Sequence, residues 1–321
     1  MRVMYRLVVC ALLALLPAAV AAQGYPAKPI RFIIPFTPGG NTDVLGRLIG
    51  QKLTEAWGQQ VVIDNRPGAG GTLGVEVATK SPPDGYTIVM GTFGGVLVAN
   101  SLYKKLGYDP QRDLAPVTLV STPPGLLVVH PSLPAKSVKE LIALARSSRG
   151  KLNYASSGSG TWNHLFGELF NTTAKIGVTH VPYKGAAPAV TDLVGGHVEV
   201  MFAPFPPAIP QVKSGKLRSL AVSGAKRSGL FPDLPTVAES GLPGYEAEGW
   251  FAVLAPAKTP HPLIVQLNKE INRVLTLPDV KASLAADGAE PAGGTPEQLA
   301  ESIRAGSAKW GKLIRELGIQ L

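Results

Sequence analysis

The chain has 321 residues, of which 45% are hydrophobic and 17% charged, with a formal net charge of +9 and a single cysteine, Cys10. That length suits one large globular domain or two ordinary ones. One cysteine excludes an internal disulfide and a thiolate metal cluster. The lysines and arginines form no long run, so we expect no nucleic-acid partner.

The first two dozen residues have the layout of a secretory signal peptide. Arg2 and Arg6 precede the apolar run "LVVCALLALLPAAVAA", which ends in small residues. We predict cleavage after Ala21 or Ala22, so that residues 1–22 are a signal peptide and the mature protein is periplasmic. The run is shorter than the roughly 20 apolar residues of a membrane span.

Short β-rich runs alternate with amphipathic helical segments along the rest of the chain. Strands are predicted by runs rich in Val, Ile, Phe and Tyr: "IRFIIPF", "QVVIDN", "YTIVMGT", "APVTLVS", "GLLVVHP", "LNYASS", "VTHVPY", "VEVMFA", "LRSLAVS" and "EGWFAVLAP". Apolar residues at helical spacing predict helices in "NTDVLGRLIGQKLTEAWG", "KSVKELIALARSS", "TWNHLFGELFNTTA" and "TPEQLAESIRAGSAKWGKLIREL". This alternation favours an α/β fold with mainly parallel sheets.

Two of these helices begin with a capping box, in which an N-cap hydroxyl and a side chain three residues later satisfy each other's backbone N–H groups. The pairs are Ser137 with Glu140, and Thr295 with Gln298. Pro296 stands at the first helical position of the last helix, where its missing N–H costs nothing.

Two passages rich in proline and apolar residues divide the chain, at 121–137 and 241–262. We predict that each crosses between two lobes. One lobe then consists of residues 23–122 and 252–321, and the other, inserted between these segments, of residues 123–251.

Glycine-rich loops follow several of the predicted strands: "FTPGGNTD", "NRPGAGGTLG", "GTFGG", "SSGSGTWNH" and "PYKGAAPAV". In open α/β sheets, ligands bind at the carboxyl ends of strands, near helix N-termini. The first turn of a helix has N–H groups without partners and a partial positive charge, and glycine lets a ligand approach them. Each loop alone is also consistent with a tight turn. Together they predict an anion site, with hydroxyl donors from Thr37, Thr42, Ser156, Ser159 and Thr161.

Motifs for catalysis or cofactor binding are missing from the sequence. "GAGGTLG" departs from the dinucleotide pattern at Leu73, and the P-loop, HExxH and GxSxG patterns do not occur. We therefore expect no cofactor, no metal ion and no catalytic residue. Asp43 and His164 could form an acid/base pair after folding. The interpretation we favour is structural: Asp43 stabilises a helix dipole, and His164 lies in a first helical turn.

Several aromatic residues have two possible roles. Phe93, Trp162 and Phe205 fall beside or within the bare loops, where they wall a pocket or pack in the core. Trp57 and Trp310 sit among helical apolar positions, and we predict that both belong to the core.

Eight segments, in order across nearly the whole chain beyond the signal peptide, resemble a known family: "YPAKPIRFIIPFTPGGNTD", "VVIDNRPGAGGTLG", "PDGYTIVMGT", "LYKKLGYDPQRDLAPVT", "NYASSGSGTWNHL", "HVPYKGAAPAVTDLVGGHVEV", "SGKLRSLAVSGAKRS" and "FPDLPTVAESGLPGY". In these the chain resembles the substrate-binding receptors of tripartite tricarboxylate transporters, the Bug-type periplasmic receptors.

The resemblance implies two α/β lobes, joined by two crossing strands, that close like a flytrap on a small carboxylate. Backbone N–H groups, hydroxyls and ordered water hold the carboxylate in such receptors. Carried over to this chain, the implied ligand-binding residues are Thr37, Gly39, Gly40, Asn41, Thr42, Asp43, Gly91, Thr92, Ser156, Gly158, Ser159, Gly160, Thr161, His164, Tyr183, Lys184, Gly185 and Ala203.

Two departures from the family pattern bear on the ligand. Ala203 stands where many members have an acidic residue, and "GGVLVAN" replaces a more polar stretch. Both changes favour aromatic or aliphatic mono- or dicarboxylates over amino acids, whose ammonium group needs an acid nearby.

The resemblance implies a monomeric receptor that delivers its ligand to membrane permease subunits. A receptor that presents the closed form to a sensor protein is the first alternative. An exported hydrolase or isomerase that uses Asp43 and His164 is the second.

Overall fold

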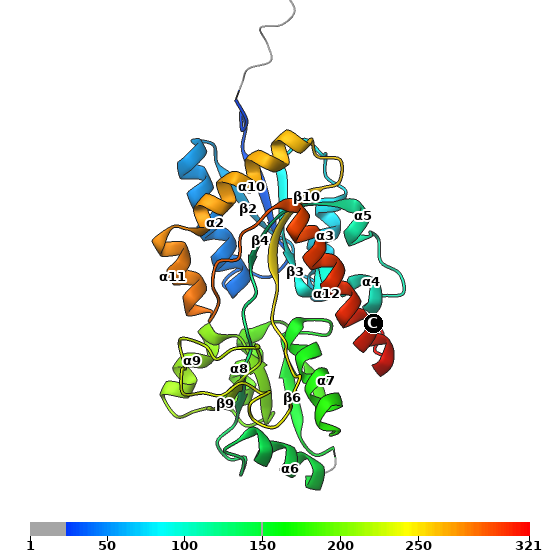
Figure 1. Cartoon of the computed structure of the whole chain (residues 1–321), viewed down its shortest axis with the longest axis vertical. Helices are drawn as coiled ribbons and strands as arrows, with labels where there is room; N and C mark the ends of the chain where they lie inside the picture. Colours follow the sequence, from blue (N-terminus) through cyan, green and yellow to red (C-terminus); the bar gives the residue numbers. More distant parts are fainter. Residues whose placement is uncertain (1–23, 149) are drawn as a thin grey trace, which may run out of the picture.

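Two bodies lie one above the other and are joined by segments that run between them (Figure 1). The computed structural model describes residues 24–148 and 150–321. The predicted signal peptide, residues 1–22, lies outside the described residues. Within them, no helix combines the length and the apolar character that crossing a membrane requires.

The ten predicted strands all form in the described part of the chain: β1 (Ile30–Ile34), β2 (Val61–Asn65), β3 (Thr87–Thr92), β4 (Leu114–Ser121), β5 (Leu126–Val129), β6 (Asn153–Ser156), β7 (Thr179–Pro182), β8 (Val200–Ala203), β9 (Arg218–Val222) and β10 (Phe251–Pro256). They make two sheets of five strands, in the orders β2-β1-β3-β10-β4 and β7-β6-β8-β5-β9. Each sheet with its helices is one lobe of a two-lobed α/β fold.

The prediction of mainly parallel sheets is wrong, because each sheet is mixed. In the first, β1 runs parallel to β2 and β3, whereas β10 runs antiparallel to β3 and β4. In the second, β6 runs parallel to β7 and β8, whereas β5 runs antiparallel to β8 and β9. The reversed strands, β5 and β10, are those that the chain enters from the other lobe. A strand that arrives from the opposite side runs against its neighbours.

This topology turns the carboxyl ends of eight strands toward the gap between the lobes. β4 leads directly into the second lobe, and β1, β2 and β3 run in the same direction as β4. In the second lobe, β6 to β9 all run opposite to β5, which leaves the gap, so they point back toward it. Ligands of open α/β sheets bind at this kind of edge.

Two crossing strands join the lobes, as predicted. The N–H of Gly249 donates to the carbonyl of Pro123 at 2.7 Å, and Pro124 and Glu248 form an antiparallel bridge. The first sheet uses strands from both ends of the chain and the second uses the middle, as an inserted lobe requires. The lobe boundaries given above stay a prediction.

Helices cover both sheets: α2 (Asn41–Trp57), α3 (Thr72–Thr79), α4 (Ala99–Leu102), α5 (Pro110–Asp113), α6 (Val138–Ser148), α7 (Trp162–Ala174), α8 (Ala186–Val194), α9 (Phe205–Lys213), α10 (His261–Leu275), α11 (Pro278–Ala286) and α12 (Pro296–Leu317), with a 3-10 turn η1 (Ala69–Gly71) and a π-helical turn η2 (Phe93–Leu97). The four predicted helices correspond to α2, α6, α7 and α12. The capping box of Thr295 and Gln298 forms in full. Only half of the capping box at Ser137 forms. The N–H of Glu140 donates to Ser137 Oγ, but the carboxylate of Glu140 accepts from the N–H of Lys136 and not from that of Ser137.

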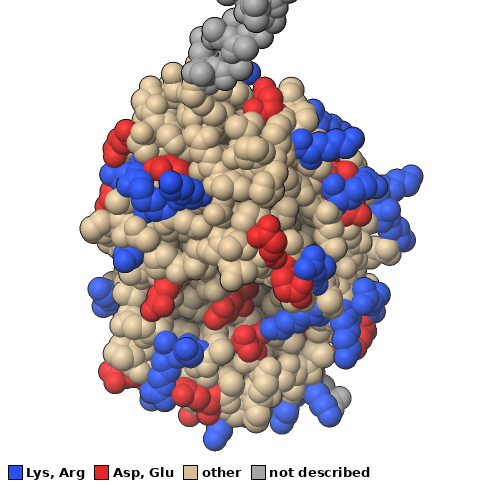
Figure 2. Space-filling model, turned by 45° about the horizontal axis from the view of Figure 1, so that its top comes forward, with Lys and Arg blue, Asp and Glu red and all other residues tan. Residues whose placement is uncertain are grey.

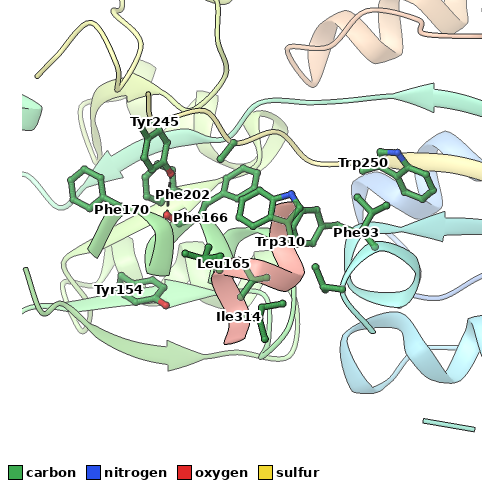
Figure 3. Packing of buried hydrophobic residues seen from close by; sticks show 14 of the residues in the cluster. Phe93, Tyr154, Leu165, Phe166, Phe170, Phe202, Tyr245, Trp250, Trp310 and Ile314 are labelled. Atoms are coloured by element: carbon green, nitrogen blue, oxygen red, sulfur yellow. Dashed lines mark hydrogen bonds between the residues drawn. The ribbon is translucent and has the colours of Figure 1, made fainter. Parts of the chain in front are cut away.

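One hydrophobic cluster extends through both lobes (Figure 3). Trp310 of α12, which packs on the first sheet, stacks on Phe166 of α7 in the second lobe, with ring centres 5.8 Å apart. Phe93 of η2 meets Trp310 edge-on at 4.9 Å. Trp310 is thus a core residue, as predicted, whereas Trp57 is only half-buried.

Candidate ligand-binding site

A cavity of about 570 Å³ lies between the lobes, at the carboxyl ends of the strands. Its volume is within the range of small-molecule sites. Both lobes contribute walls, and the lining residues are Phe36, Thr37, Pro38, Gly39, Gly40, Asn41, Thr42, Val44, Leu45, Gly70, Thr92, Phe93, Gly94, Ser157, Thr161, Trp162, Lys184, Gly185, Ala186, Ala187, Pro188, Pro204, Pro206, Pro207, Phe251, Ser283, Leu284, Ala286 and Asp287.

Four helices begin at the wall of this cavity. Their N-cap residues are Gly40 for α2, Thr161 for α7, Gly185 for α8 and Pro204 for α9, and all four line the cavity. None of these residues makes a side-chain cap hydrogen bond. In α9, Pro206 and Pro207 have no N–H, and the N–H of Phe205 faces Asp287. The first turns of α2, α7 and α8 therefore keep donors for a ligand, and the partial positive charges of these helix ends favour a small anion at the same place.

Glycine keeps the cavity open over two of these helix starts. A methyl group at Gly40 would have the carbonyl oxygen of Thr37 as its nearest neighbour, at 3.8 Å, and one at Gly39 or Gly185 would meet nothing within 4 Å. A ligand can therefore reach the backbone N–H groups at these positions.

Other glycines in the bare loops serve the contact between the lobes. A methyl group at Gly70 would lie 3.1 Å from the carbonyl oxygen of Ser159, and one at Gly160 would lie 3.1 Å from Leu102 Cδ1. At Gly94 it would overlap the carbonyl of Gly70 and lie 3.0 Å from that of Gly160. The loops after β2 and β3 thus approach the loop after β6 closely because they have glycine at the points of contact.

Asp43 holds the loop at the start of α2. The carboxylate, which is 2% exposed, accepts hydrogen bonds from the N–H of Gly39 at 2.9 Å and from Arg47 Nε at 2.9 Å. Asn65 Nδ2 donates a third at 2.8 Å. Burial raises the pKa of Asp43, but these hydrogen bonds outweigh it and keep the pKa below its ordinary value. Asp43 therefore remains ionised and fixes the shape of the cavity wall.

Two stacked histidines support the loop between β6 and α7. The rings of His164 and His180 lie 4.0 Å apart, His164 Nδ1 accepts from the N–H of Gly160 at 3.1 Å, and His180 Nε2 lies 2.6 Å from Ser156 Oγ. Burial lowers the pKa of His164 to about 4. Burial and the neighbouring His164 lower the pKa of His180 to about 3. Both rings are neutral at pH 7.

Acid should therefore destabilise the fold. At a pH between the unfolded pKa of about 6.5 and the folded pKa of about 4, His164 is protonated in the unfolded chain but not in the folded chain. The free energy of unfolding therefore decreases as the pH is lowered through this range. Between pH 7 and pH 5 this one group accounts for about 2 kcal/mol. Denaturant unfolding of the wild type and of His164→Gln at both pH values measures it. A glutamine variant as acid-sensitive as the wild type would contradict the assignment, and the exposed His261→Gln is the matched control.

Half of the predicted ligand-binding set lines the cavity: Thr37, Gly39, Gly40, Asn41, Thr42, Thr92, Thr161, Lys184 and Gly185. The other members lie outside the lining, in the supporting loops or in the strands: Asp43, Gly91, Ser156, Gly158, Ser159, Gly160, His164, Tyr183 and Ala203. A methyl group at Gly91 would overlap Leu254, so that glycine serves packing. Contact of any of these residues with a ligand stays a prediction.

Asp43 and His164 have the structural roles favoured in the sequence analysis. The partners of Asp43 all belong to the first lobe and those of His164 to the second. Of the described residues, no group of three or more His, Cys, Asp or Glu side chains is arranged to hold a metal ion. Trp162 and Phe93 line the cavity, whereas Phe205 is a fully buried core residue.

Sequence reasoning missed the wall formed by the end of α11 and the start of α9. Ser283, Leu284, Ala286 and Asp287 contribute to it, as do three prolines around the start of α9. Asp287 brings a carboxylate into a cavity that the sequence predicted to be less polar. No local motif marks these residues, because only the meeting of the two lobes brings them together.

Thr92, at the end of β3, has a buried hydroxyl without a hydrogen-bond partner, as has Ser121 at the end of β4, among the residues described. Such a group costs about 1–3 kcal/mol. Thr92 also lines the cavity, so an unused donor stands beside the uncapped helix starts.

Two α/β lobes, two crossing strands and a cavity between them define a periplasmic binding protein fold. The family described as the tripartite tricarboxylate transporter family receptor matches residues 45–319, and the chain belongs to this family. The receptors of this family bind substrates, so the chain is a binding protein rather than an enzyme.

Relatives agree with this assignment. BugT of Bordetella pertussis is 40% identical over 305 residues, which are 95% of this chain and 94% of BugT. Among solved structures, R. palustris Rpa4515 with adipate has 40% identity and a TM-score of 0.87, covering 92% of this chain and 100% of that one. MatC from Rhodopseudomonas palustris with bound malate has 32% identity and a TM-score of 0.84, covering 90% and 100%. The chain is thus similar to Bug-type receptors, and two of its structural neighbours hold carboxylates.

Proposed function

We propose that this protein is exported to the periplasm, where it captures a small organic mono- or dicarboxylate between its lobes and delivers it to the permease of a tripartite tricarboxylate transporter. The convergence of three uncapped helix N-termini, those of α2, α7 and α8, on one cavity carries this proposal. Amide donors and helix dipoles favour an anion there without a fixed counter-charge. The adipate and malate held by the two structural neighbours support carboxylate as the anion.

Binding is coupled to closure in this proposal. The ligand bridges helix starts that belong to different lobes, α2 on one side and α7 and α8 on the other. A ligand that contacts both lobes stabilises the arrangement in which they meet. The paired crossing strands at Pro123 and Gly249 are the hinge. The permease then recognises the closed form, which exists mainly when the cargo is bound.

Native mass spectrometry of the protein purified from its host, with identification of the released ligand, tests the class of ligand. Calorimetry with hexanoate and hexanamide then tests the mechanism, because the two have the same shape and differ in charge. We expect hexanoate to bind at least about tenfold more tightly, since only the anion gains from the helix ends. Equal affinity for the neutral amide would contradict an anion trap.

A further inference from the structure

Asp287 is the one acidic side chain among the described residues of the cavity wall. It ends α11 in the first lobe and is 9% exposed. The other charged side chain in the wall, Lys184, is exposed and belongs to the second lobe. A buried carboxylate inside an anion-binding cavity is unexpected, because it repels the ligand unless it has a role of its own.

The partners of Asp287 are the groups that would bind a ligand anion. Asn41, the first residue of α2, donates from Nδ2 to Asp287 Oδ2 at 3.1 Å. The backbone N–H of Phe205, the first residue of α9, also faces this carboxylate and lowers its pKa. Asp287 thus lies between the N-termini of two helices from different lobes.

The sequence of α9 explains why its start needs an acceptor from elsewhere. The N-cap is Pro204, which has no side-chain acceptor, and Pro206 and Pro207 have no N–H to donate. Phe205 is therefore the first residue of α9 with an N–H to satisfy, and Asp287 reaches it from the other lobe. Gly288 allows this approach, because a methyl group there would lie 3.1 Å from the ring of Phe205.

We propose that Asp287 is an internal carboxylate that occupies the anion position between α2 and α9, and that it thereby makes the receptor select monocarboxylates over dicarboxylates. This inference rests on the proposed function. The ligand keeps the position formed by α2, α7 and α8, where Gly40 and Gly185 leave space. A second carboxylate on the same ligand cannot bind at the start of α9, because Asp287 occupies this position and its negative charge repels the ligand. Asp287 is a specificity-determining residue in this scheme.

Proton binding to Asp287 should weaken the selection. Burial raises the pKa of Asp287 to about 7, although the hydrogen bond from Asn41 and the nearby N–H of Phe205 oppose the shift. Asn41 and the N–H of Phe205 face it from α2 and α9, and Lys184 is the other charged side chain of the described wall. As pH falls from 8 to 6, Asp287 becomes neutral while a dicarboxylate stays largely ionised. Repulsion of the second carboxylate then decreases.

Acids matched in length test the proposal: butanoate with succinate, hexanoate with adipate, and octanoate with octanedioate. Calorimetry at pH 8 should show the wild type binding its preferred monocarboxylate at least tenfold more tightly than the matched dicarboxylate. Asp287→Ala, which vacates the position, should lower this ratio at least tenfold. Asp287→Asn keeps the shape without the charge and should move the ratio in the same direction. The exposed Asp233→Asn should leave it unchanged.

Each outcome is decisive. If the wild type prefers dicarboxylates, or if both Asp287 variants keep its ratio, the inference is overturned and the proposed function stands. If neither an acid of the series nor the acid that co-purifies with the protein binds the wild type, the proposed function fails with it. If the Ala variant does not fold, the Asn variant still tests the proposal. Its side chain can keep a hydrogen bond with Asn41, because the amide group of Asn41 can flip to present either its oxygen or its NH2 group. At pH 6 the affinity of the wild type for the monocarboxylate, relative to the matched dicarboxylate, should be closer to one than at pH 8. The same ratio at both pH values would contradict the role proposed for Asp287.

Discussion

Replacing Gly40 with valine is expected to lower the carboxylate affinity by roughly 100-fold or more, because the side chain would cover the first N–H groups of α2. The fold should tolerate the change. Gly40 has φ −77° and ψ 164°, a conformation open to every residue, and its nearest neighbour would be 3.8 Å away. Calorimetry with the co-purified acid measures the loss, and the melting temperature without ligand should stay within about 1 °C of the wild type.

Gly177→Val is the matched control. Gly177 lies in the turn between α7 and β7, at the end of β7 that points away from the cavity, and a methyl group there would also meet nothing within 4 Å. The control should bind as tightly as the wild type. If Gly40→Val retains wild-type affinity, the start of α2 is not part of the anion site.

Trp310→Ala is expected to have the largest effect on stability, a loss of about 3–5 kcal/mol in the free energy of unfolding. The ring is 4% exposed and contacts Phe93 of the first lobe and Phe166 of the second (Figure 3). Its removal leaves a cavity where the core passes between the lobes. Denaturant unfolding at pH 7 gives the value.

Trp57→Ala serves as the comparison, because that ring is half-buried and has an edge contact with Tyr25 at 6.0 Å. Its cost should be about 1–2 kcal/mol, as expected for partial burial. Equal costs for the two variants, or a cost below about 1 kcal/mol at Trp310, would show that the cluster of Phe93, Phe166 and Trp310 does not hold the lobes together.

The strands and helix starts were predictable because their signals are local. β1, β3, β5 and β8 are buried along nearly their whole length, so they appear in the sequence as unbroken apolar runs. The capping box at Thr295 fixes the start of α12 within four residues of sequence. The helix starts at Gly40 and Thr161 were predicted from apolar residues at helical spacing, whereas α8 begins in a segment that the sequence analysis treats only as a glycine-rich loop.

Strand direction and the far wall of the cavity depend on long-range geometry instead. Whether β5 and β10 run with or against their neighbours is decided by the crossing strands, which short-range periodicity does not record. Asn41 and Asp287 are 246 residues apart, and no residue near Asp287 marks it as part of a site. The glycine-rich loops after β2, β3 and β6 were predicted to leave room for a ligand, and Gly70, Gly94 and Gly160 in these loops also let the two lobes approach each other.

Lysine and arginine side chains form no single basic patch on the face shown in Figure 2. Acidic and basic side chains are interspersed there, and most of this face is uncharged. In the proposed site, the attraction for an anion comes instead from backbone amides at the helix ends, which carry no formal charge.

A crystal structure of the protein with the acid that co-purifies with it tests the central claim most directly. We predict carboxylate oxygens within about 3 Å of backbone N–H groups in the first turn of α2 and in the first turn of α7 or α8. An acid bound outside the cavity, or inside it but held only by side chains of one lobe, would contradict the claim that uncapped helix ends of both lobes grip the ligand.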